Sequence, residues 1–307
     1  MTRGSWFGEL IRRPYGAFGL GWLALIVLSA AVSLVWTPHD PFAADPYDSW
    51  LGPSGAHLFG TDSVGRDIFS YVFSATRTTV IVAAASGATA LVVGVALSAL
   101  GALTGRWLRE STAVLLDILI AFPTVLIAMA LAAVFGGSLV VVVVSVGIAY
   151  GVNIARVSRG EIRRVARTDY VLAARANGLG SAAVLRRHVL PNTAPTFVVQ
   201  LSLSMATSIL AEAGLSFLGY GAPASVASWG RLLSDLQRFI GVHPWSAVWP
   251  GLAITLTVLA FNLLGDALRE ATDPRLRSSG RRPAAEAPRP GRPGADDAGR
   301  TTPGVTA

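Results

Sequence analysis

The chain has 307 residues, of which 52% are hydrophobic and 14% charged, and its formal net charge is +7. All 25 basic residues are arginine, so the chain has neither a P-loop lysine nor a Schiff-base lysine, and any ATP that it uses must be hydrolysed by another chain. No cysteine is present, which excludes disulfides, thiolate metal sites and cysteine nucleophiles. Because the arginines cluster beside apolar runs, the positive charge indicates membrane topology, and we expect no nucleic-acid partner.

Apolar residues form runs of about 20, the length that crosses a hydrocarbon core of ~30 Å. The sequence therefore predicts an all-α polytopic membrane protein with six transmembrane helices. The expected spans are residues 17–36, 79–103, 112–135, 139–154, 195–217 and 247–268. Arg12 and Arg13 precede the first span as in a secretory signal, but the apolar run is too long for one, so we interpret this span as an uncleaved anchor.

Arginines are distributed unevenly among the connections between these spans. Eight lie between spans four and five, whereas the connections on the opposite side hold only Arg66, Arg77, Arg231 and Arg238. Since arginine accumulates on the cytoplasmic side, both termini and the loop between spans four and five are predicted to be cytoplasmic in a plasma or inner membrane. The expected parts are a cytoplasmic N-terminus (1–16), a first transmembrane helix (17–36), an extracytoplasmic segment with an interfacial helix (37–78), a five-helix core (79–277) with a cytoplasmic loop (156–192), and a disordered cytoplasmic tail (278–307).

The loop between spans four and five is predicted to carry two short helices. Thr168 or Asp169 caps the first helix and Gly178 stops it. Ser181 caps the second helix and Pro191 ends it. A membrane protein that keeps such a pair outside the bilayer presents it to a partner. The alternative is an amphipathic pair that rests on the membrane surface, because arginine is abundant there.

This loop resembles the EAA-type motif of binding-protein-dependent ABC importer permeases. The motif runs Glu-Ala-Ala, three residues, Gly, nine residues, an apolar residue, one more residue, and Leu-Pro. The matching positions are Ala173, Ala174, Gly178, Leu190 and Pro191. The sequence departs from the motif twice, with Leu172 in place of Glu and His188 in the apolar slot.

Further motifs resemble the peptide and nickel permeases, in the branch of oligopeptide and dipeptide C-type subunits. Residues 60–67 resemble the Gly-Thr-Asp-x-x-Gly-Arg-Asp signature of that branch, and residues 212–219 resemble its Glu-x-x-Leu-Ser-Phe-Leu-Gly segment. Residues 250–252, 262–266 and 273–275 resemble its last helix and exit. Together with the predicted topology, these motifs cover most of residues 9–277.

The resemblance implies an import complex of this non-catalytic permease, a homologous second permease, two ATPase subunits and an extracytoplasmic binding protein. ATP and Mg²⁺ would bind to the ATPase subunits, and we expect no cofactor on this chain. In such transporters the loop docks in a groove of the ATPase, whose closure moves the transmembrane helices. The expected docking residues are Asp169, Ala173, Ala174, Gly178, Arg187, His188, Leu190 and Pro191.

Polar residues recur at near-helical spacing in the fifth span, so one side of that helix is expected to be polar. They are Gln200, Ser204, Thr207, Ser208 and Glu212. Such a side faces a water-filled pathway or packs against other helices, because lipid would not solvate it. Glu212 is close to the outer end of the span, where a gate or an extracellular ion pair is an equal alternative.

Asp117 lies inside the third span and is a further candidate for the pathway. A carboxylate near the membrane centre costs at least ~2.5 kcal/mol, so pairing with an arginine or a backbone donor is the expected arrangement, and contact with substrate is the alternative. Pro123 is predicted to kink the same helix.

The signature before span two is predicted to form a turn that leads into a short interfacial helix. Its candidate residues are Gly60, Thr61, Asp62, Gly65, Arg66 and Asp67. Either aspartate could pair with the arginine or cap the helix, and the alternative is contact with the binding protein. A metal site formed by Asp62, Asp67 and His57 is disfavoured, because the four histidines are scattered.

The sequence therefore predicts a permease subunit of an ATP-driven importer for dipeptides or oligopeptides. Nickel or metallophore import remains an alternative within the same family. A channel or a scaffolding membrane protein is an alternative of another class, and it would work without ATP. An intramembrane enzyme is disfavoured, because no Ser/His, paired Asp or His-rich constellation occurs at catalytic spacing.

Overall fold

The computed structural model describes residues 10–11, 13–103 and 106–272, and every regular element in these ranges is helical. Five helices are long and apolar enough to cross a membrane by length and composition. They are α2 (Pro14–Ser33), α3 (Ile68–Leu103), α6 (Leu139–Ala166), α9 (Leu190–Phe217) and α11 (Pro244–Thr272). The predicted all-α polytopic class is thereby confirmed, while the predicted tail 278–307 lies outside the described residues.

The third expected span is broken into α4 (Arg106–Ala121) and α5 (Thr124–Phe135), which meet at an angle of 79°. Pro123 stands at the break with an extended backbone, and a proline also drives the residue before it out of the helical region. The predicted kink is confirmed, and it is sharp enough that the pair counts as a sixth span only if both helices are taken together.

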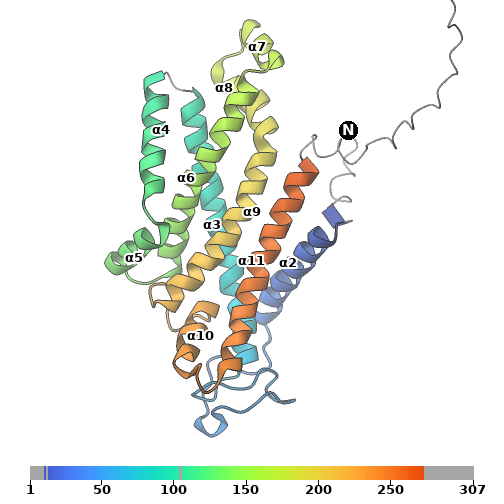
Figure 1. Ribbon diagram of the computed structural model, residues 1–307, viewed down its shortest axis with the longest axis vertical. Coiled ribbons are helices and arrows are strands. Elements are labelled where there is room, and N and C mark those ends of the chain that lie inside the picture. The colour runs from blue at the N-terminus through green and yellow to red at the C-terminus, as the bar shows by residue number, and fades with distance from the viewer. Residues whose placement is uncertain (1–9, 12, 104–105, 273–307) are drawn as a thin grey trace, which may run out of the picture. The chain divides into compact units, whose positions relative to one another are not determined.

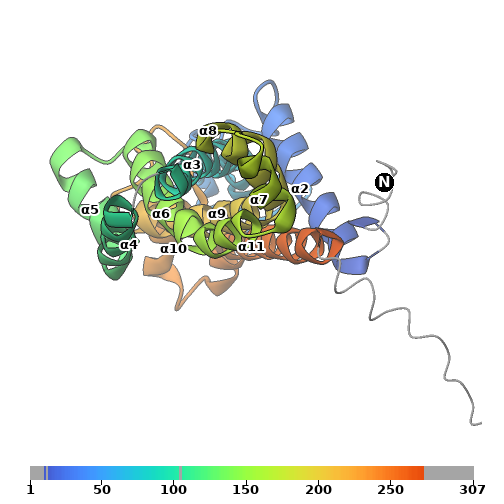
Figure 2. The same cartoon turned by 90° about the horizontal axis from the view of Figure 1, so that it is seen from above.

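The long helices lie side by side, with α3 against α2, α6 and α9, and with α11 against α2 and α9 (Figure 1). Figure 2 shows α4 and α5 beside α6, on the side of the bundle away from α2. Gly147 and Gly151 let α6 approach α3, because a Cβ atom at either position would lie 2.6 Å from a side chain of α3. Small residues four apart commonly allow such close helix packing in membranes.

The short elements gather at opposite ends of the long helices (Figure 1). One end carries α7 (Asp169–Ala176), α8 (Ser181–Val184) and the π-helix η2 (Leu185–Val189). The other end carries α10 (Trp229–Leu236), the 3₁₀ helices η1 (Pro46–Asp48) and η3 (Gln237–Phe239), and the chain between α2 and α3. We refer to them as the α7 end and the α10 end.

The start of α3 differs from the prediction. Instead of a separate interfacial helix before residue 79, one continuous helix begins at Ile68 directly after the signature. The polar first turns of this helix are covered by α10, since Trp229 is 1% exposed and its indole donates to the carbonyl of Val72 at 2.9 Å. Apolar runs mark the part of a helix in lipid, and they miss the part buried in protein.

Candidate functional site

The first helix of the loop, α7, ends as the sequence predicts. Gly178 adopts a φ of +84°, and the amide of Leu179 returns to the carbonyl of Ala174 at 3.1 Å, which closes the helix. Thr168 occupies the N-cap position, but its hydroxyl donates to the carbonyl of Val165 and provides no side-chain cap. Nothing lies within 4 Å of a Cβ built at Gly178, so only its backbone conformation favours glycine there.

The second helix of the loop differs from the prediction at both of its ends. Gly180 rather than Ser181 is the N-cap, and Pro191 does not end the helix, because α8, η2 and α9 run on continuously from Ser181 to Phe217. The wider π turn just before Pro191 accommodates a residue that lacks an amide donor.

The two residues after this proline donate from their side chains to carbonyls one turn back. The amide of Asn192 donates to the carbonyl of His188 at 2.6 Å, and the hydroxyl of Thr193 donates to the carbonyl of Val189 at 3.1 Å. The loop therefore passes into the fifth span as one helix, without the break that proline suggests.

The expected docking residues lie mainly on the outside of this segment. Asp169, Ala173, Gly178, Arg187 and Pro191 are exposed, and Ala174, His188 and Leu190 are half-buried. Leu172, which replaces the Glu of the motif, is 49% exposed. Apolar side chains hold the segment on the bundle, as Val171, Val184, Leu185 and Val189 are buried in one cluster with Ile154, Ile162, Val165 and Phe197.

The signature at the α10 end forms a tight turn organised by Asp62, which is 1% exposed. Its carboxylate accepts from the amides of Val64 and Arg66, both at 2.9 Å, and from Arg66 Nε at 2.6 Å. Arg66 also reaches Asp235 of α10 at 3.0 Å. Burial lowers the pKa of Arg66, but the two carboxylates outweigh it and raise the pKa above its usual value.

The same turn caps α3, as one of the predicted alternatives states. Asp67 accepts from the amide of Ser70 at 2.7 Å, and its other oxygen lies 3.0 Å from His57 Nδ1. Thr61 accepts from the amide of Leu51 at 2.8 Å. The pairing of an aspartate with Arg66 and the capping of α3 by an aspartate are both confirmed.

The glycines of the signature are required by the turn. Gly60 and Gly65 have φ angles of +75° and +79°. A Cβ atom at Gly65 would lie only 1.8 Å from the carbonyl oxygen of Asp45, and one at Gly60 would lie 2.5 Å from that of Leu51. Both conformation and space therefore exclude a side chain.

The structure brings together a different group of possible metal ligands from Asp62, Asp67 and His57, the group considered in the sequence. His39, His57 and Asp67 bring their ligand atoms within 4.8 Å of one another, whereas Asp62 is occupied by Arg66. His39 was missed because 18 residues separate it from His57, and the two rings meet only in the folded turn, where they stack at 4.8 Å.

The polar residues of α9 divide into two groups. Ser204 and Ser208 are buried, and their hydroxyls donate to carbonyls one turn back in α9 at 2.8 and 2.6 Å. This arrangement fits the helix-packing alternative. Thr207 is exposed and Gln200 is half-buried, so the pathway interpretation rests on these two residues.

Glu212 is 2% exposed and lies against the start of α10. Its carboxylate accepts from the hydroxyls of Ser216 and Ser228 at 2.6 and 2.8 Å. Within the described ranges no basic side chain is paired with it, so the ion pair weighed for Glu212 is not formed there. Asp117, in contrast, has the expected partner, since Arg156 Nε of α6 lies 3.6 Å from its carboxylate.

These features define a polytopic membrane protein that presents a helical segment outside the bundle at one end. Residues 90–278 match the family described as the inner membrane component of binding-protein-dependent transport systems. The chain therefore belongs to this family, the permease subunits of ABC importers, and within it to the peptide and nickel group.

Three relatives illustrate the group. The chain is 34% identical to the dipeptide transport system permease protein DppC of Alkalihalophilus pseudofirmus, over 89% of this chain and 90% of that protein. It is 36% identical to the glutathione transport system permease protein GsiD of Pectobacterium atrosepticum, over 89% and 91%. It is 34% identical to the nickel transport system permease protein NikC of Escherichia coli, over 83% and 92%.

Proposed function

We propose that this permease passes the motion of a partner ATPase to its own membrane helices and thereby imports dipeptides or oligopeptides by alternating access. One observation carries the proposal: in the docking segment (residues 169–191), the second part, Ser181 to Pro191, forms a single helix with the fifth span, and this helix ends at Phe217. At 1.5 Å per residue, these 37 residues extend about 55 Å. A displacement at the α7 end is therefore transmitted by a rigid element rather than by a loop.

The arginine distribution supports the orientation of the proposed complex. Eight arginines between residues 156 and 187 favour a cytoplasmic α7 end, where ATP is available, and an extracytoplasmic α10 end. The proposed partners are a homologous second permease, two ATPase subunits that bind ATP and Mg²⁺, and an extracytoplasmic binding protein at the α10 end. The absence of lysine from the chain supports ATP hydrolysis elsewhere in the complex.

Docking is tested by replacing Gly178 with glutamate in the assembled importer. The side chain would strain a left-handed backbone position and place bulk and charge on the exposed docking face. We expect uptake to fall to background and the ATPase to be lost on co-purification, while membrane insertion is retained. The control is Gly52→Glu at the α10 end, an open position that should retain the ATPase. Normal uptake by well-inserted Gly178→Glu would refute the docking role.

The cargo is tested by uptake into proteoliposomes that contain the complete complex. Labelled dipeptide, labelled oligopeptide and ⁶³Ni²⁺ are supplied in turn with the cognate binding protein, each with and without ATP. ATP-dependent accumulation of peptide supports the proposal, and accumulation of nickel alone would support the metal alternative that the relationship to NikC suggests. Flux of either cargo without ATP would indicate a channel.

A further inference from the structure

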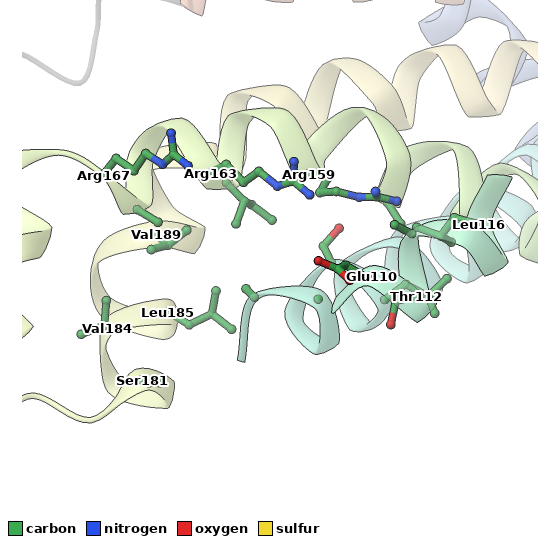
Figure 3. A pocket seen from close by; sticks show the side chains of 18 of the residues that line it. Glu110, Thr112, Leu116, Arg159, Arg163, Arg167, Ser181, Val184, Leu185 and Val189 are labelled. Atoms are coloured by element: carbon green, nitrogen blue, oxygen red, sulfur yellow. The ribbon is translucent and has the colours of Figure 1, made fainter. Parts of the chain in front are cut away.

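A cavity of about 530 Å³ opens at the α7 end, between α3, α4, α6 and the start of the helix that carries α8 and η2. Figure 3 shows it from close by, with α6 along one side and α4 opposite. The cavity does not include the turn at the α10 end or the polar residues of α9. The cavity is therefore distinct from those two sites, and it shares Val184, Leu185 and Val189 with the apolar cluster that holds the docking segment.

Guanidinium groups dominate the polar lining of this cavity. Arg159, Arg163 and Arg167 follow one another on α6 at intervals of four residues, and Figure 3 shows their side chains in a row along one wall. Arg175 joins them from α7, and Glu110 is the acidic side chain among the lining residues. Four positive charges against one negative charge make the cavity attractive to an anion.

Two polar atoms in the cavity wall lack hydrogen-bond partners among the described residues. They are Arg159 Nη2 and Ser98 Oγ, and both are buried. Buried polar atoms are nearly always satisfied in folded proteins, and an unsatisfied guanidinium nitrogen is costly. An anion in the cavity would supply acceptors to Arg159.

Most of the remaining cavity wall is apolar, and this limits the kinds of anion that would fit the cavity. Leu97 of α3, Leu116 of α4 and Ile162 of α6 line it beside Val184 and Leu185. A small soluble anion would leave this surface without a partner. A ligand that has both a charged group and a hydrocarbon part would cover both kinds of wall.

We infer that this cavity binds the phosphate headgroup of an anionic phospholipid, with the guanidinium groups on the phosphate and the apolar wall against the start of an acyl chain. Arginine forks match phosphate oxygens, and basic pockets between transmembrane helices are suited to anionic headgroups. The cavity lies along the arginine-rich C-terminal part of α6, and arginines at the end of a membrane helix are typical of the headgroup level. The inference does not depend on the cargo or on ATP coupling.

Binding is measured with the full-length chain in nanodiscs of phosphatidylcholine that contain a small fraction of spin-labelled phosphatidylglycerol. The immobilised fraction of the label reports the bound lipid. Arg159→Gln with Arg163→Gln should weaken binding by about tenfold or more. The matched control is Arg186→Gln with Arg187→Gln, which removes the same charge from exposed positions outside the cavity and should change binding less than about twofold.

Inorganic phosphate is the probe that tests whether the cavity binds a soluble phosphate ligand instead of a lipid headgroup. Titration with phosphate, compared with chloride at matched ionic strength, should not release the labelled lipid. Displacement by phosphate but not by chloride would overturn the lipid assignment in favour of a soluble ligand. Equal loss in both double variants, or in neither, would overturn the site itself, because the attraction would then be general or absent.

A second measurement uses the unaltered chain, so that it does not depend on the folding of any variant. Phosphatidylglycerol with a photoreactive headgroup is incorporated and irradiated, and the labelled peptides are identified by mass spectrometry. We expect labelling to be concentrated in residues 155–167 and 181–189. Unlabelled phosphatidylglycerol should reduce this labelling, and unlabelled phosphatidylcholine should not. Labelling spread evenly over all helix ends would contradict the inference.

Discussion

At the α10 end, the turn of residues 60–67 is fixed by side-chain hydrogen bonds and ion pairs, and its central carboxylate, Asp62, is 1% exposed. At the α7 end, the docking segment is held by an apolar cluster beneath it, while Ala173 and Gly178 remain on the outside. Polar networks fix a unique geometry, whereas an apolar cluster beneath a segment leaves its outer face exposed. The comparison indicates a rigid frame at one end and an exposed helical surface at the other, which is the surface proposed to bind the ATPase.

The largest expected effect breaks the polar network. Arg66→Ala leaves Asp62 buried without its ion-pair partner, which should reduce the free energy of unfolding by about 3–5 kcal/mol. The matched control is Asp235→Asn, which removes the more exposed partner of the same arginine and should cost no more than about 1 kcal/mol. Denaturant titration of the purified protein measures both. Equal effects would show that the buried network does not frame this end.

A smaller effect on stability is expected for the ion pair between α4 and α6, which lies between the two ends of the bundle. Arg156→Gln leaves Asp117 without its partner at 3.6 Å, and we expect a loss of about 2 kcal/mol, because an unpaired carboxylate in a membrane helix is costly. Adding Asp117→Asn should recover most of that loss. A double-mutant cycle on unfolding free energies measures the coupling, and strictly additive losses would contradict the pairing.

The smallest expected effect on stability concerns the left-handed backbone conformation of Gly178 at the α7 end. Gly178→Ala should cost about 1 kcal/mol, since alanine is strained at a φ of +84°. Gly160→Ala is the control, because Gly160 lies inside α6 without a positive φ and both positions have open space for a Cβ atom. Thermal unfolding in detergent should separate the two variants. A Gly160 variant that is as destabilised as the Gly178 variant would show that conformation is not what favours glycine.

Much of this comparison follows from the sequence. Apolar runs locate the long helices, Gly178 predicts the end of α7, and the signature predicts that Asp62 or Asp67 pairs with Arg66. These features depend on residues within a few positions of one another, and local chemistry is what a single sequence displays.

Other features could not be predicted, because they depend on distant parts of the chain. The bond between Arg66 and Asp235 joins residues 169 positions apart, and the covering of α3 by Trp229 hides its true start at Ile68. The predicted helix end at Pro191 is wrong for a different reason. Proline usually ends a helix, but here a π turn lies just before it and accommodates a residue without an amide donor. No local sequence pattern predicts that turn.

The central claim is that the α7 end docks on the ATPase, and site-specific cross-linking tests it most directly. The chain has no cysteine, so Ala173→Cys at the α7 end and Val64→Cys at the α10 end each provide one site for a photoreactive maleimide in the assembled complex. We expect the Ala173 probe to form an adduct with an ATPase subunit and the Val64 probe to form none. An ATPase adduct from Val64 together with none from Ala173 would contradict the account.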